Sequence, residues 1–92
     1  MNRILSKRQL SDAVFGMTVE APLVARARKA GQFVIIMVDE EAGERIPLTI
    51  ADADPEAGSI SLVFQAVGAT TMKLSRKEPG DFLPADFYQS HQ

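Results

Sequence analysis

The apolar, β-branched run FVIIMV at 33–38 constrains the fold of this chain more than any other feature. Gly31 precedes it, and an acidic, glycine-containing loop at 39–44 follows it. A short apolar run between turn-forming residues predicts a mostly buried strand. Because 92 residues have room for one hydrophobic core, the other segments must pack around this strand.

Two further strands are predicted before this run, at 2–10 and 14–20, joined at Ser11-Asp12. Their apolar residues are spaced more like those of strands than those of a helix, and 14–20 alternates apolar with small or polar residues.

A β-hairpin is predicted after it. Strands at 46–50 and 60–67 flank a segment, 52–58, whose Asp, Pro and Gly residues are typical of a turn. Pro47 cannot donate a ladder hydrogen bond, which places it at an edge, a bulge or a strand start. We expect room there for something other than a neighbouring strand.

Two short helices are predicted between the strands. Pro22 opens the first, over 23–29, and Gly31 closes it. After Gly68, Thr70 or Thr71 is expected to cap a second helix that runs to about Arg76. Pro79-Gly80 then turns the chain into a last extended segment, 81–83.

Together these elements predict an all-β fold, a six-stranded antiparallel Greek-key barrel with one or two short helices. Closure of the sheet is expected because an open sheet of this size would present unpaired edges.

The composition excludes several classes of function. A net charge of −2 provides no general attraction for nucleic acid or for an anionic membrane. The chain has no cysteine, which excludes disulfides, thiolate metal sites and an iron–sulfur cluster in this segment. No stretch reaches the roughly 20 apolar residues that span a bilayer. We therefore expect a cytoplasmic protein without a nucleic-acid or membrane partner.

The segment from Val67 to Thr71 is a candidate anion site. A strand that passes through glycine into a helix brings backbone N–H groups and threonine hydroxyls to one point, which favours phosphate. The alternative is that Gly68 turns the chain and a threonine caps the helix with nothing bound.

Arg45 is a second candidate, since a guanidinium can contact phosphate oxygens in a bidentate manner. The alternative is a solvated arginine that pairs with Glu41 or Glu44. Thr49 follows Arg45 by four residues, so a strand would place both side chains on one face, about 13 Å apart. That spacing suits an extended ligand with an anionic end and a polar ring end.

Two motifs carry a family resemblance: Arg45-Ile46-Pro47-Leu48-Thr49-Ile50, and 64–71, which reads FQAVGATT. They resemble the FAD-binding barrel of ferredoxin reductase-type proteins. The likeness is strongest to the ferredoxin–NADP reductase alpha subunit, or sulfide dehydrogenase B, family, related to the dihydroorotate dehydrogenase electron-transfer subunit. The resemblance covers 1–83 as one domain and leaves 84–92 as a divergent, mobile tail.

The resemblance implies a flavin site. Arg45 would contact the FAD pyrophosphate, Leu48 the flavin or ribityl chain, and Thr49 the isoalloxazine ring. The backbone of Gln65, Ala66 and Val67 would meet the flavin edge. The other implied contacts are Pro47, and Gly68, Thr70 and Thr71 at the pyrophosphate. FAD is favoured over FMN, and no catalytic or metal-binding residue is assigned. Leu48 stands where the wider superfamily has an aromatic residue, and Arg45 is displaced by one position.

Members of this family continue into a nucleotide-binding domain and then a cysteine cluster for a [2Fe-2S] centre. The sequence therefore predicts a truncated flavin-binding domain of an NAD(P)H-linked electron-transfer oxidoreductase, not competent in catalysis without its NAD(P)-binding domain and a partner redox subunit. The alternative is a non-catalytic β-barrel interaction module with an empty flavin site.

Several other residues are assigned no chemistry. His91 lies in the tail, Asp52, Asp54 and Glu56 are interpreted as turn formers, and the basic residues at 26–29 as a solvated helix face. Core packing is expected for Phe15, Phe33 and Phe64. Phe82, Phe87 and Tyr88 predict an exposed apolar surface through which the chain forms a homo-oligomer.

Overall fold

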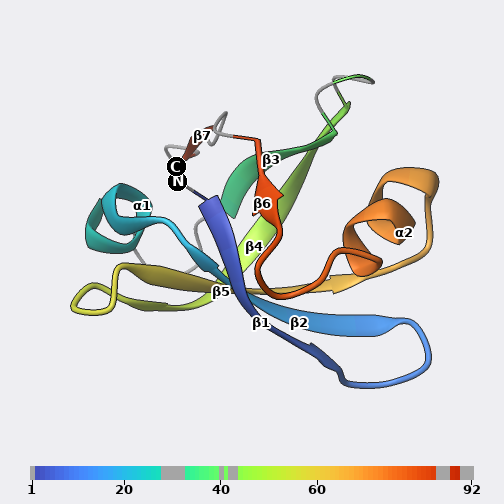
Figure 1. The fold of residues 1–92 in the computed structure, drawn as a ribbon, viewed down its shortest axis with the longest axis horizontal. Helices are drawn as coiled ribbons and strands as arrows, with labels where there is room; N and C mark the ends of the chain where they lie inside the picture. The colour runs from blue at the N-terminus through green and yellow to red at the C-terminus, as the bar shows by residue number, and fades with distance from the viewer. Residues whose placement is uncertain (1, 28–32, 40, 42–43, 85–87, 90–92) are drawn as a thin grey trace.

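The computed structural model describes residues 2–27, 33–39, 41, 44–84 and 88–89. Seven strands and two helices lie in these ranges (Figure 1). In chain order they are β1 (Asn2–Gln9), β2 (Val14–Glu20), α1 (Pro22–Ala27), β3 (Phe33–Asp39), β4 (Glu44–Asp54), β5 (Ser59–Gln65), α2 (Ala69–Ser75), β6 (Phe82–Leu83) and β7 (Tyr88–Gln89).

The strands form one antiparallel sheet in the order β6-β1-β2-β5-β4-β3-β7. β2 and β5 are neighbours although α1, β3 and β4 lie between them in the chain, which is a Greek-key connection. The sheet curls until β6 also lies close to β3, so the barrel is nearly closed. The predicted all-β barrel is confirmed.

The barrel interior is filled by alternate residues of its strands. In β3, Val34, Ile36 and Val38 are buried while the residues between them are half-buried. Phe64 is buried, and the half-buried Phe15 lies opposite it with ring centroids 5.9 Å apart. Both rings belong to the core, whereas Phe33 is half-buried at the start of β3.

The turn between β4 and β5 is shorter than predicted. β4 continues to Asp54, and only 55–58 form the turn. The Asp54 Oδ1 atom accepts hydrogen bonds from the amides of Glu56 and Ala57, both 3.1 Å long. This carboxylate therefore organises a turn, as interpreted from the sequence.

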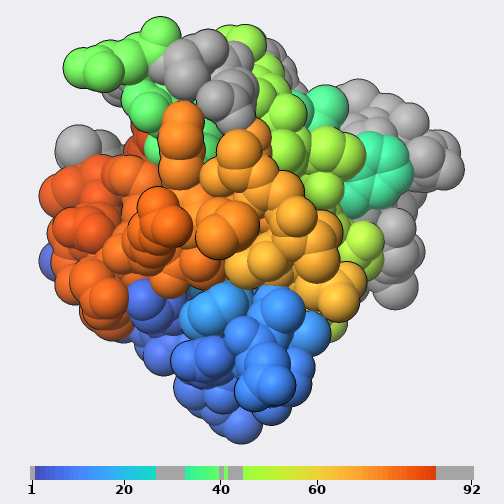
Figure 2. Space-filling view, turned by 90° about the vertical axis from the view of Figure 1, so that its right-hand side faces the viewer, coloured from blue at the N-terminus to red at the C-terminus, as the bar shows by residue number. Residues whose placement is uncertain are grey.

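The two helices lie where the sequence places them, with one correction at α2. Its N-cap is Gly68, whereas a threonine was expected, because Thr71 is the third residue of the helix and its hydroxyl bonds back to residue 68. Leu74 is fully buried and fixes α2 to the barrel. Figure 2 shows α2 (orange) at the centre of one face, with the β1–β2 hairpin (blue) below it.

The predicted tail contains β7, in which Tyr88 pairs with Ile35 and Gln89 with Val34. Residues 85–87 and 90–92, including Phe87 and His91, lie outside the described residues, as does the predicted end of the first helix at Gly31. Neither described helix is long and apolar enough to cross a membrane.

Candidate functional site

β4 changes its partner halfway along its length. Its first half, up to Thr49, pairs with β3, and from Ile50 onward it pairs with β5. The change coincides with a bulge between Ile50 and Asp52. Within the described ranges β4 and β5 have no pair beyond Ile50↔Leu62, and Figure 1 shows the two strands diverging from that point.

The divergence leaves a gap between 44–49 of β4 and 63–68, which we call the β4–β5 gap. Strand edges that face such a gap carry backbone N–H and C=O groups that no neighbouring strand satisfies. Pro47 lies on this edge and has no N–H to leave unpaired. Pro47 keeps its pairing with Ile35 of β3 and has no partner from β5 among the described residues, so of the three predicted positions it occupies the edge.

The β4 side of the gap presents Arg45, Pro47 and Thr49 on its outer face. All three are exposed, and they alternate with the half-buried Ile46 and the buried Leu48. The predicted common face of Arg45 and Thr49 is therefore present. Leu48 is only 8% exposed and belongs to the core, so a ligand on the outer face would meet its backbone and not its side chain.

The β5 side of the gap carries the other predicted contacts. If the β4–β5 register continued past Ile50↔Leu62, Gln65 would face Pro47 and Val67 would face Arg45. Gln65 and Gly68 are exposed, Ala66 is half-buried, and Val67 is 71% exposed. The two predicted motifs therefore lie on the two sides of one gap.

The start of α2 is already hydrogen-bonded in part. Thr71 Oγ1 accepts from the amides of Gly68 (3.0 Å) and Val67 (3.2 Å), and donates to the Gly68 carbonyl (3.1 Å). The Ala66 amide donates to the Ala13 carbonyl at 2.7 Å. The first amides of a helix have no carbonyl four residues back, so an anion at this point would compete with Thr71 for them.

Sequence reasoning assigned no role to the basic residues at the other end of α2. Lys73, Arg76 and Lys77 line a cleft between α2 and β6. Helical spacing gives no signal for this cleft, because Lys77 lies beyond Ser75, the last residue of α2.

Comparison with known proteins supports the resemblance. The chain is 52% identical over 87 residues to an uncharacterized protein in the adh 3′ region of Clostridium beijerinckii, covering 95% of this chain and 29% of that protein. It is 43% identical over 81 residues to a dihydroorotate dehydrogenase B (NAD(+)) electron transfer subunit homolog of Thermotoga maritima, covering 88% of this chain and 28% of the homolog. No family model matches the sequence.

Solved structures agree. A chain of an NADH-dependent reduced ferredoxin–NADP oxidoreductase superposes with a TM-score of 0.89 at 41% identity, covering 95% of this chain and 31% of that one. A siderophore-interacting protein from Acinetobacter baumannii shares the fold at a TM-score of 0.67 and 14% identity, covering 89% of this chain and 37% of that one. The chain thus spans about 30% of the length of its curated relatives. By sequence and by fold, it is a ferredoxin reductase-type barrel homologous to dihydroorotate dehydrogenase B electron transfer subunits.

Proposed function

We propose that this chain is the flavin-binding part of an NAD(P)H-linked electron-transfer oxidoreductase subunit, and that its flavin is FAD. The observation that supports the proposal most is the β4–β5 gap, which brings both sequence motifs of the resemblance to one place. The names of the relatives, electron transfer subunits of NAD(+)-linked enzymes, agree with it.

The residues at the gap fit such a group. The exposed guanidinium of Arg45 would hold the pyrophosphate, and Thr49 would offer a hydroxyl to the polar ring. Backbone groups of Pro47, Leu48 and 65–67 would meet the edge of the ring system. The start of α2, with Gly68, Thr70 and Thr71, would favour the negative diphosphate.

The protein's contribution is to bind and orient the group and to keep its ring at the sheet edge. Bound flavin itself would supply the chemistry of hydride acceptance and electron transfer. Because the core behind β4 and β5 is closely packed, the two sides of the gap would hold a ligand on a rigid support.

Titration of the purified chain with FAD, followed by flavin absorbance and fluorescence, tests the proposal. We expect saturable binding of one FAD. FMN, which lacks the adenylate, and riboflavin, which lacks all phosphate, should bind more weakly. Absence of saturable FAD binding at concentrations up to about 1 mM, which corresponds to about −4 kcal/mol, would contradict it.

Reduction by a nicotinamide is proposed to need further protein. Hydride transfer requires the donor ring to be held close to the flavin, and that orientation is proposed to come from an NAD(P)-binding domain, with a partner redox subunit receiving the electrons. We expect the FAD-loaded chain to oxidise NADH and NADPH no faster than free FAD does. Rapid turnover by the 92 residues alone would refute this part.

A second candidate is a β-barrel interaction module whose flavin site is empty. The observation in its favour is that Thr71 already occupies the amides of Val67 and Gly68. Under this alternative the purified chain stays colourless after excess FAD has been added and the unbound FAD removed, and the gap residues are insensitive to the ligand in NMR spectra.

Self-association is also proposed, through the apolar surface that includes Phe82, whose side chain is 49% exposed. Light scattering should show an average mass that rises with concentration and falls towards 10.0 kDa, the monomer mass, in Phe82→Ser. A strict monomer at all concentrations would contradict this proposal.

A further inference from the structure

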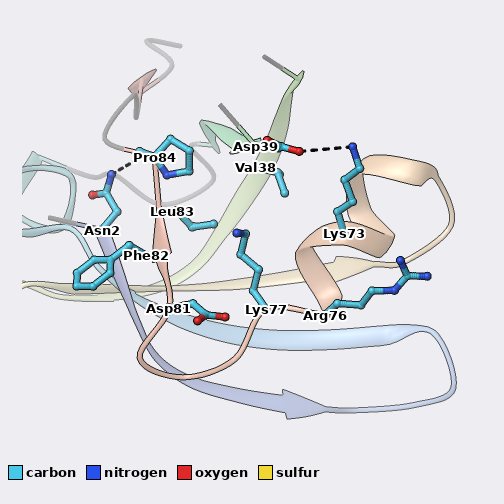
Figure 3. Close-up of a pocket in the computed structure, with 10 residues that line it drawn as sticks. All are labelled: Asn2, Val38, Asp39, Lys73, Arg76, Lys77, Asp81, Phe82, Leu83 and Pro84. Carbon is cyan, nitrogen blue, oxygen red and sulfur yellow. Dashed lines mark hydrogen bonds and ion pairs between the residues drawn. The ribbon is translucent and has the colours of Figure 1, made fainter. Parts of the chain in front are cut away.

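A second cleft, of about 790 Å³, lies where the barrel closes. Figure 3 shows β6 on one side of it, the end of β3 behind it and α2 on the other side. Its ten lining residues are Asn2, Val38, Asp39, Lys73, Arg76, Lys77, Asp81, Phe82, Leu83 and Pro84. None of them is a proposed flavin contact, so this cleft is distinct from the β4–β5 gap.

The volume is in the range of small-molecule sites, which run from about 300 to 1,000 Å³ and combine apolar walls with a few polar groups. The apolar wall here is β6 and the residue after it. Leu83 is 3% exposed and points towards Lys77, Pro84 is half-buried, and the 49% exposed Phe82 has its ring on the other side of β6 (Figure 3). Asn2 braces this wall through a 3.0 Å hydrogen bond from its Nδ2 to the Pro84 carbonyl.

The charged side chains of the cleft differ in their partners among the described residues, and Arg76 points away from β6 (Figure 3). Lys73 is engaged with Asp39, its Nζ lying 3.8 Å from the carboxylate. Asp81 accepts a 2.8 Å hydrogen bond from the Glu78 amide. By contrast, the Lys77 ammonium has no ion pair or hydrogen bond in the described part of the chain, and Figure 3 shows it reaching into the cleft towards Leu83.

The lining has three cationic and two anionic side chains, in a chain whose net charge is −2. A half-buried ammonium beside an apolar wall is stabilised by an anion that brings its own apolar body. From this arrangement we propose that the cleft binds a small amphiphilic anion, with its acidic head at Lys77 and its apolar body lying across β6, along Pro84 and as far as Phe82. This proposal does not depend on whether the β4–β5 gap holds flavin.

A pair of fluorescent probes tests it: 8-anilinonaphthalene-1-sulfonate and its uncharged counterpart N-phenyl-1-naphthylamine, which has the same aromatic body without the sulfonate. Titrations are run on the full chain at a concentration where light scattering gives the monomer mass of 10.0 kDa, because the proposed self-association surface includes Phe82. We expect saturable binding of one sulfonate probe. Lys77→Gln should weaken it about fivefold and leave the uncharged probe unchanged.

The control is Arg26→Gln, which removes one positive charge from the exposed surface of α1, away from the cleft, and should leave both probes unchanged. Phe82→Ser should weaken both probes, since it removes apolar wall without changing charge. Amide shifts in NMR spectra should concentrate on 76–84 and persist with FAD present.

The proposal is overturned if the sulfonate probe does not saturate, if Arg26→Gln weakens it as much as Lys77→Gln does, or if the shifts map to another surface. The NMR spectrum of Lys77→Gln is recorded as well, to show that weaker probe binding is not caused by unfolding of the variant. If the probe is displaced by FAD, the cleft is not a separate site and the proposal fails, while the proposed flavin function stands.

Discussion

The hydroxyl of Thr71 accepts a 3.0 Å hydrogen bond from the amide of Gly68, three residues before it. The same oxygen accepts from the Val67 amide and donates to the Gly68 carbonyl. One side chain therefore satisfies the backbone at the point where β5 passes into α2. This contact stabilises the start of the helix and also competes with any anion for the two amides.

Thr71→Ala should lower the free energy of unfolding by about 1 kcal/mol, the usual cost of losing a side-chain hydrogen bond at a helix start. Thr71→Ser keeps the hydroxyl and should lie within about 0.5 kcal/mol of the parent chain, so it is the matched control. Urea unfolding followed by circular dichroism measures both. Equal losses in the two variants would show that the methyl group, not the hydroxyl, is responsible.

Arg45→Gln should weaken FAD binding about tenfold, because a charge-assisted contact to a phosphate is worth roughly 1.5 kcal/mol or more. Riboflavin lacks phosphate, so its affinity should not change. The ratio of the two affinities separates the pyrophosphate contact from general damage to the gap. Arg26→Gln serves again as the charge control, and a parallel loss of riboflavin binding would contradict the assigned role of Arg45.

Leu74→Ala should destabilise the protein by about 2–5 kcal/mol, because it opens a cavity at a side chain that is 0% exposed and holds α2 against the barrel. Met72→Ala, in the same helix at 43% exposed, should cost less than about 1 kcal/mol. Thermal or urea unfolding compares them. A small effect of Leu74→Ala would mean that α2 is not fixed by this contact.

Gly58→Ala should be more destabilising than Gly80→Ala, although both positions have positive φ, 70° and 96°. The left-handed backbone costs an alanine about 1 kcal/mol at either site. At Gly58 the added Cβ would also lie 3.3 Å from Pro22 Cβ and Cγ, whereas at Gly80 it meets nothing within 4 Å. We expect Gly58→Ala to lower the free energy of unfolding by about 2 kcal/mol in total. Equal losses in the two variants would show that α1 moves to accommodate the new methyl group.

The sequence located most elements because their signals are local. Apolar alternation predicted β2 and the start of β5, and the continuous apolar run at 33–38 predicted β3. The Asp and Gly residues before β5 predicted the turn that Asp54 organises. The predictions that were wrong also have physical causes. β4 runs on to Asp54 because β5 supplies partners for its second half, and Gly68 rather than a threonine caps α2 because Thr71 can reach back from the first turn.

For the candidate site, the sequence by itself identified Arg45, Thr49 and the segment that leads to Gly68, and it marked Pro47 as a break in pairing. Only the tertiary structure decided that β4 exchanges β3 for β5 at Ile50, so that the two motifs lie on the two sides of one gap. It also decided that Lys77 lines one cleft with Phe82 and Pro84. The physical reason is the distance along the chain over which each interaction acts. Propensity, alternation and turn chemistry act between neighbours in the chain. A gap or a cleft depends on contacts between strands far apart in sequence, such as Asn2 beside Leu83.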